Sequence, residues 1–155
     1  MSSERDIDLV NDLRKQPAET PWLEFKSSLN DHDKIGHLIS ALSNSARLEG
    51  KESAFLVWGI EDGSHNVVGT TFDPFTKTVG NQVFEFWLKQ KLSPAPVLQF
   101  RRVEHPDGKL ILLEIPAPTA APTSFEGTPF IRVGSATPGL PPLKWSSAMF
   151  SKTEE

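Results

Sequence analysis

The chain has 155 residues, 37% of them hydrophobic, no cysteine and a formal net charge of -4. Its length predicts one domain with a single core, and the lack of cysteine excludes disulfide frameworks and cysteine-based zinc sites. The first residues lack the apolar core of a signal peptide, and no segment is apolar for long enough to span a bilayer. We therefore expect a cytoplasmic protein with no membrane partner.

The net charge, taken alone, argues against a nucleic-acid partner, because phosphate binding usually accompanies a surplus of basic residues. The charges are unevenly distributed, however. Five basic residues and two acidic ones lie in the segment from Lys89 to Lys109. A local basic face is therefore compatible with an acidic chain.

A short N-terminal helix is expected first, followed by a strand over residues 22–26. Apolar and charged residues alternate in this strand, so Leu23 and Phe25 share one face. If that face enters the core, Glu24 and Lys26 point to the opposite surface.

The next two elements are predicted by longer apolar patterns. Residues 32–47 carry apolar side chains at helical spacing, and Asn30 or Asp31 could cap the start of this helix. Residues 54–60 are continuously apolar, as expected of a strand that is buried on both faces.

The second half of the chain predicts one more main helix and a hairpin. An N-cap at Asp73 would begin the helix, with Val79 on its apolar face. Strands over 97–104 and 109–115 are joined by a turn sequence, and residues 129–133 form another strand-like segment. These elements predict an α+β fold, in which two main helices pack on a mixed, mainly antiparallel sheet.

Acidic residues lie near both of the first two strands. Glu19 and Glu24 flank the start of one, and Glu61 and Asp62 follow the other. Carboxylates on neighbouring strands can converge on magnesium or manganese, which could stabilise a scissile phosphate or activate water. The alternative is that Glu24 faces solvent and Asp62 only serves a turn. The residues alone favour that alternative.

Basic residues give a second candidate site. Arg132 lies in a strand-like run that leads to Ser135, where a guanidinium and backbone amides could contact a phosphate. A solvated arginine on an edge strand explains the pattern equally well. Arg101 and Arg102 lie on opposite faces of their predicted strand, so at most one of them joins a given patch. The four histidines lack the spacing of zinc ligands.

Several further segments follow one another in a set order and spacing. They are Glu19 with residues 23–28, then residues 39–45, 57–63, 67–69, 93–96, 109–116 and 130–137. Together these segments resemble the Schlafen AlbA-like domains of bacterial transcriptional regulators and animal Schlafen proteins, and their order and spacing carry the resemblance more than any one of them does.

The resemblance divides the chain into three parts. Residues 19–140 form the AlbA-like domain, residues 1–18 an N-terminal helix or extension, and residues 141–155 a C-terminal tail. One departure lies after the asparagine-containing helix, where relatives usually carry a Gly-Gly pair. Residues 46–53 have a single glycine there, which puts in doubt a close backbone contact with phosphate.

The resemblance also implies roles for the acidic residues. Nucleolytic members of the family use three acidic residues for a metal-dependent cut in RNA. The matching positions are Glu19, Glu24 and Asp62, which would be both the metal ligands and the catalytic residues. Many bacterial relatives are considered DNA-binding only, so the resemblance leaves catalysis open.

Three functions follow as hypotheses. The first is the nucleic-acid-binding domain of a transcriptional regulator, which grips the DNA or RNA backbone without a cofactor. The second is a magnesium- or manganese-dependent endoribonuclease of structured, tRNA-like RNA. The third is a protein-interaction domain that binds no nucleic acid, and a homodimer is an open alternative throughout. The residues expected to bind nucleic acid are Lys26, Lys89, Lys91, Arg101, Arg132 and Ser135.

Overall fold

A four-stranded sheet forms the centre of the protein in a computed structural model, which describes residues 4–133 and 137. The strand order is β1-β2-β7-β6, with β1 parallel to β2 and the other two pairs antiparallel. The fold is therefore α+β, as predicted. The bounds of these strands are Leu23–Lys26 for β1, Ser53–Trp58 for β2, Gln99–His105 for β6 and Gly108–Pro116 for β7.

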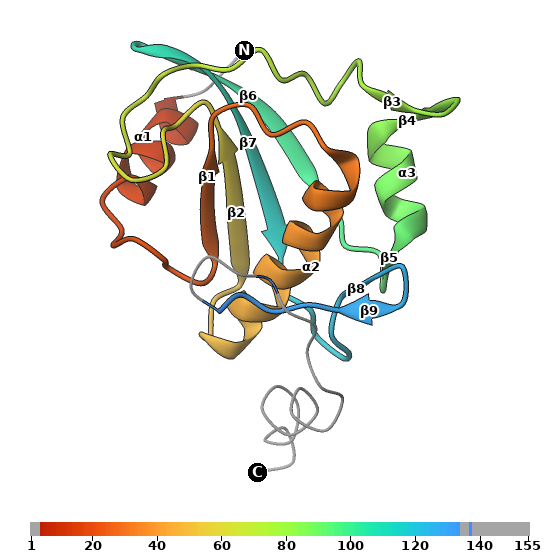
Figure 1. Cartoon of the computed structure of the whole chain (residues 1–155). Helices are drawn as coiled ribbons and strands as arrows, with labels where there is room; N and C mark the ends of the chain where they lie inside the picture. Colours follow the sequence, from red (N-terminus) through yellow and green to blue (C-terminus); the bar gives the residue numbers. More distant parts are fainter. Residues whose placement is uncertain (1–3, 134–136, 138–155) are drawn as a thin grey trace.

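Helices cover both faces of this sheet (Figure 1). Helix α1 (Glu4–Leu13) packs on the face that carries Leu23 and Phe25. Helices α2 (His32–Leu48) and α3 (Phe84–Lys91) pack on the opposite face. Both faces of the sheet are consequently apolar over most of their area, and each has its own core cluster.

Helix α2 is capped by Asp31, one of the two residues that the sequence analysis offered for this role. The Asp31 carboxylate accepts hydrogen bonds from the backbone N–H groups of Asp33, at 3.0 Å, and Lys34, at 3.2 Å. Gly50, at φ 73°, ends the helix in a left-handed conformation that favours glycine. The cap fixes the direction in which the first turn of α2 presents its side chains.

The second main helix begins later than the sequence suggested. Asp73 caps a turn, in which its carboxylate accepts the N–H of Phe75 at 2.9 Å, and α3 starts only at Phe84. Gly80, at φ 61°, turns the chain between β3 (Thr78–Val79) and β4 (Gln82–Val83). The prediction was wrong here because a local hairpin replaces the first turns of the helix.

The strand expected over 129–133 is also placed differently. A small sheet of β5 (Leu92–Ser93), β8 (Ser124–Phe125) and β9 (Thr128–Pro129) forms instead, and residues 130–133 continue along α2. Within the described part of the chain, no helix has the length and apolar character needed to cross a membrane.

Candidate functional site

Strand β1 places two charged side chains on the α2 side of the sheet. Leu23 and Phe25 are buried beneath α1, so the alternation of the strand turns Glu24 and Lys26 towards α2. Lys26 is the last residue of the strand and pairs in register with Trp58 of β2. Both charges therefore lie near the end of the sheet, beside the start of α2.

Glu24 is held in an ion pair rather than exposed to solvent. Its side chain is only 11% exposed, and one carboxylate oxygen accepts a hydrogen bond from the guanidinium of Arg132, which is 5% exposed. The other carboxylate oxygen lies 3.3 Å from the ammonium of Lys26. The interpretation that Glu24 faces solvent was thus wrong, and its charge is balanced by two internal cations.

A polar stripe on α2 holds the segment that carries Arg132. The Asn44 amide donates to the carbonyl oxygens of Thr123, at 2.9 Å, and Phe130, at 2.8 Å, and its oxygen accepts the N–H of Thr123 at 2.8 Å. The Ser45 hydroxyl accepts the N–H of Arg132 at 3.1 Å. These buried bonds position Arg132 over β1. Sequence reasoning did not assign this role, although a buried asparagine in an apolar helix face needs such partners.

The three predicted acidic residues border one small pocket, here called the acidic pocket. Glu19, Glu24 and Asp62 all line it, and its volume of about 20 Å³ is room for roughly one water molecule. Glu19 adopts a φ of 62°, and both Glu19 and Asp62 are exposed. The three positions matched by the family resemblance therefore border the same pocket.

The carboxylates of the acidic pocket do not have the geometry of a metal site. Among residues 4–133 and 137, no group of three or more histidine, aspartate or glutamate side chains is placed to hold an ion. Glu24 is directed towards Arg132 and Lys26, whereas a magnesium or manganese ligand would direct its oxygens to the ion. The residues present therefore do not fit a bound metal in this arrangement.

A larger pocket with the opposite charge lies on the other side of the Glu24–Arg132 pair, and is called the cationic pocket. It has a volume of about 350 Å³, and no acidic residue is among those described that line it. Lys26 and Arg132 were predicted as phosphate ligands, and the structure brings them together here with Lys34 and His37. The lining consists of Lys26, Leu29, Lys34, His37, Leu38, Arg132 and Thr137.

Lys34 and His37 come from the first turns of α2, and the sequence analysis did not assign them to a site. Their spacing of three residues places them on neighbouring positions of one helix face. The imidazole of His37 packs against the rings of Phe125, at 5.0 Å, and Phe130, at 4.7 Å between centroids. This packing fixes the ring at the pocket wall, which the helical pattern alone could not show.

Comparison with known proteins identifies the fold family. The sequence profile described as "Schlafen, AlbA_2" matches residues 19–140. This chain belongs to the Schlafen AlbA_2 family. No curated protein sequence gives a significant match to it.

The DIP2311 structure shares the fold of this Schlafen AlbA_2 domain at low sequence identity. The DIP2311 protein of Corynebacterium diphtheriae is 17% identical, with a TM-score of 0.58 over 96% of this chain. The domain spans 28% of the length of that protein. The N-terminal domain of a RecG-related protein from Nitrosomonas europaea is also 17% identical, with a TM-score of 0.47. That match covers 88% of this chain and 92% of the other.

The other basic residues predicted to bind nucleic acid lie outside the cationic pocket of this AlbA_2 domain. Lys89 is exposed on α3, and Lys91 lies 3.6 Å from a carboxylate oxygen of Glu126. Arg101 is on the α1 face of the sheet, where it is 3.0 Å from Asp6 and also pairs with a second carboxylate.

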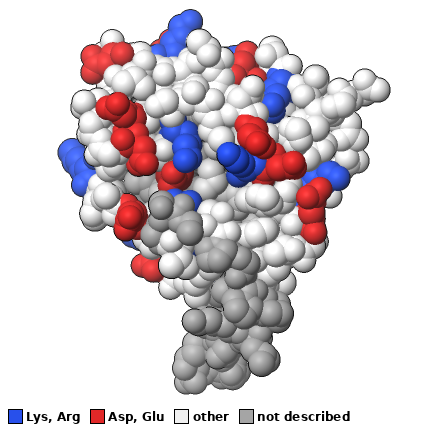
Figure 2. Space-filling model, viewed as in Figure 1, with Lys and Arg blue, Asp and Glu red and all other residues white. Residues whose placement is uncertain are grey.

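Charge on the surface is mixed. On the face that presents β1 and α2, lysine and arginine side chains are interspersed with acidic ones and do not gather into one basic area (Figure 2). The predicted phosphate ligand Ser135 lies outside the described residues. The candidate site is consequently the cationic pocket itself, rather than a broad basic face.

Proposed function

We propose that this Schlafen AlbA_2 domain binds nucleic acid through the phosphate backbone, with the cationic pocket as the main contact. The observation that carries the proposal is that four cationic or ionisable basic side chains line one pocket, with no acidic residue among the described lining. They come from β1, α2 and the segment after β9. The resemblance of the sequence to the AlbA-like domains implies the same activity.

The chemistry of the pocket suits a phosphate group. The ammonium of Lys34 supplies a charged hydrogen-bond donor, and Lys26 and the planar guanidinium of Arg132 add positive charge although both also pair with Glu24. Among the described residues, the Lys34 ammonium has no ion-pair partner. Contacts of this kind position a backbone and carry no sequence information directly. We therefore expect binding that is sensitive to salt and has little sequence preference.

The proposal is tested by removing one charge from the pocket. Anisotropy of labelled single-stranded DNA, duplex DNA and tRNA is measured over a range of salt concentrations for the wild type and for Lys34→Gln. Loss of one phosphate contact should weaken binding and reduce the salt slope by about one. Lys89→Gln on α3 removes the same charge outside the pocket and should bind as the wild type does. Binding that is insensitive to salt, or unchanged in Lys34→Gln, would contradict the proposal.

Metal-dependent cleavage is a second candidate, favoured by the three carboxylates that border the acidic pocket. It would require Glu24 to leave Arg132, because Glu24 cannot direct the same oxygens to an ion. The test is incubation of tRNA with manganese or EDTA, using the wild type and Asp62→Asn. Cutting that needs manganese and is lost in Asp62→Asn would support this candidate, and absence of metal-dependent cutting would remove it.

A further inference from the structure

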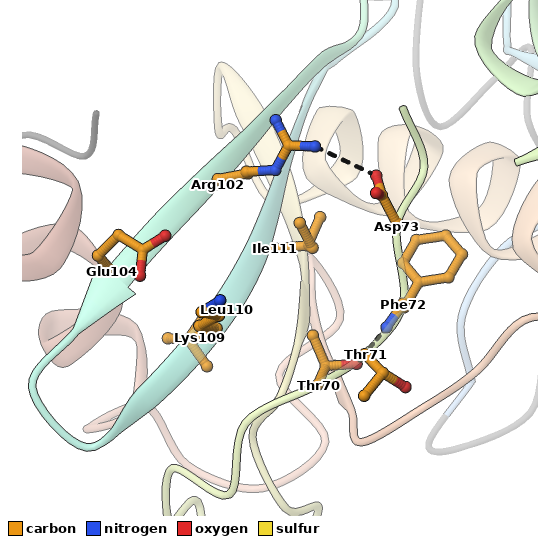
Figure 3. A pocket seen from close by; sticks show the side chains of 9 residues that line it. All are labelled: Thr70, Thr71, Phe72, Asp73, Arg102, Glu104, Lys109, Leu110 and Ile111. Atoms are coloured by element: carbon orange, nitrogen blue, oxygen red, sulfur yellow. Dashed lines mark hydrogen bonds and ion pairs between the residues drawn. The ribbon is translucent and has the colours of Figure 1, made fainter. Parts of the chain in front are cut away.

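Two more pockets follow the cationic pocket along the end of the sheet. The first, called the middle pocket, has a volume of about 440 Å³ and begins at Ser27, directly after Lys26. The second, called the outer pocket, has a volume of about 400 Å³ (Figure 3). The middle and outer pockets share Thr70, Thr71 and Lys109. The middle and outer pockets are therefore contiguous, and the cationic pocket adjoins them where Lys26 is followed by Ser27; the three together are called the path.

The register of the sheet explains why Lys26 and Arg102 lie at opposite ends of this path, where the outer pocket is also lined by Asp73 and Glu104. Lys26 pairs with Trp58, Trp58 with Ile111, and Ile111 with Arg102. These four residues form one row across the four strands, on the α2 face of the sheet. Neighbouring strands are about 4.8 Å apart, so the ends of the row are separated by roughly 14 Å. Lys109 lies next to this row, because it precedes Ile111 by two residues on β7 and so shares its face of the strand.

The wall between the pockets is built rigidly by close backbone contacts. The N–H of Thr70 donates to the carbonyl oxygen of Lys109 at 3.0 Å, which joins the loop to β7. A Cβ atom at Gly108 would lie 3.2 Å from the backbone of Gly69. A Cβ at Gly59, whose φ is 101°, would lie 3.0 Å from the same carbonyl oxygen of Lys109. The glycines thus allow the loop to pack directly on the hairpin.

Hydrogen-bonding groups line the middle of the path. Ser27, Ser28, Thr70 and Thr71 bring hydroxyl groups to the middle pocket, where Lys109 adds a positive charge. In the part of the chain that the structure describes, the exposed Lys109 ammonium makes no ion pair. Hydroxyls and lysines are the groups that commonly contact phosphate and sugar.

An exposed aromatic ring lies beside the outer pocket, in contact with Arg102 of its lining. The guanidinium of Arg102 lies over the ring of Phe75, 4.2 Å from its centroid, and also pairs with Asp73 at 3.4 Å. Phe75 is 39% exposed although it is large and apolar. Figure 3 shows Arg102 and Asp73 facing each other across the outer pocket, from β6 and from the loop. Exposed aromatic rings and arginine planes are the surfaces on which unpaired bases stack.

We infer that this path binds a single-stranded segment of nucleic acid, which runs from the cationic pocket past Lys109 to the Arg102–Phe75 stack. The inference rests on the proposed function and extends it from one phosphate contact to a track with a direction. Phosphates follow Lys26, the hydroxyl groups and Lys109, and an unpaired base stacks at Phe75. A duplex lacks such a free base, so the single strand is the ligand that uses the whole path.

The experiment measures binding as a function of strand length. Oligothymidylates and oligouridylates of about 4 to about 16 nucleotides cover the range of single-strand site sizes. With the wild type, affinity should rise with length until the path is filled. Lys109→Gln and Phe75→Leu should each weaken the longest strand by about tenfold, the size expected of a lost phosphate or stacking contact, and leave the shortest unchanged. Phe75→Leu keeps an apolar side chain, and both altered positions are exposed.

The variants separate failure of this inference from failure of the proposed function. If Lys34→Gln weakens strands of every length but Lys109→Gln and Phe75→Leu bind the longest strand as the wild type does, the track is wrong and the cationic pocket stands. If the wild type binds no strand, or Lys34→Gln binds all of them normally, the proposed function fails. Duplex DNA of equal length that binds as tightly, with the same loss in Phe75→Leu, would overturn the choice of a single strand. Lys89→Gln is the control for loss of charge.

Discussion

The acidic and cationic pockets lie on either side of one ion pair, yet their charges have different consequences. In the acidic pocket, Glu19 and Asp62 are exposed, and Glu24 is already neutralised by Arg132 and Lys26. In the cationic pocket, Lys34 adds a charge with no ion-pair partner among the described residues. The number of charged residues in a pocket is therefore a poorer guide to its ligand than the partners those charges already have.

Replacing Asn44 should cause the largest loss of stability, because Asn44 holds the segment that carries Arg132, and both pockets border Arg132 or its partner Glu24. Asn44→Ala leaves the N–H of Thr123 and the carbonyl oxygen of Phe130 without this partner, while the carbonyl oxygen of Thr123 keeps the Ser40 hydroxyl. We expect a loss of roughly 4 kcal/mol in the free energy of unfolding, since each such group costs about 1–3 kcal/mol. Urea denaturation of the wild type and the variant measures this difference in the free energy of unfolding. Asn81→Ala, at an exposed turn, is the control, and a loss below about 1 kcal/mol would contradict the assigned role.

Substitution of Glu24 should cost far more stability than substitution of Asp62, although both residues belong to the predicted triad. Glu24→Ala leaves Arg132 buried without its carboxylate, and we expect a loss of about 3 kcal/mol in stability. Asp62→Ala removes an exposed carboxylate and should change stability by less than about 0.5 kcal/mol. Thermal and urea denaturation compare the two variants. Equal effects would mean that the ion pair does not distinguish Glu24 from the other acids.

Protonation of Asp31 should cause a smaller loss of stability. Asp31 caps the turn of α2 that presents Lys34 to the cationic pocket. The backbone N–H of Lys34 donates to the carboxylate and holds the pKa of Asp31 below its ordinary value of 3.8. The stabilisation is therefore present above the unfolded pKa and is lost as the pH falls through the lower folded value. Thermal unfolding from about pH 5 downward should show a steeper loss in the wild type than in Asp31→Asn, which keeps a capping side chain. Identical pH profiles would argue against the cap.

Manganese should have the smallest effect, because Glu24 remains paired with Arg132. We expect no change in the unfolding midpoint on adding manganese, whereas a ligand at about 100 times its dissociation constant would add about 2.7 kcal/mol. Differential scanning fluorimetry of the wild type and Asp62→Asn makes the comparison. A rise that disappears in Asp62→Asn would show that the acidic pocket can rearrange around a metal.

Local patterns were sufficient for most of the sheet and for α2. Alternation in β1, the apolar run of β2, the turn between β6 and β7, and the cap at Asp31 were all read from neighbouring residues. The start of α3 was missed, because apolar spacing continued through a segment in which Gly80 turns the chain. The acidic triad could be brought together only by the family resemblance, since spacing alone favoured a different interpretation.

The sequence by itself determined the α+β class, the family and the placement of Glu24 and Lys26 on one face of β1. Only the tertiary structure decided that Arg132, 108 residues away along the chain, neutralises Glu24, and that Lys34 and His37 join the cationic pocket. Periodicity records which face of an element is buried, but not which distant segment returns to cover it. That return depends on the hydrogen bonds of Asn44 and Ser45, whose partners lie about 80 residues away.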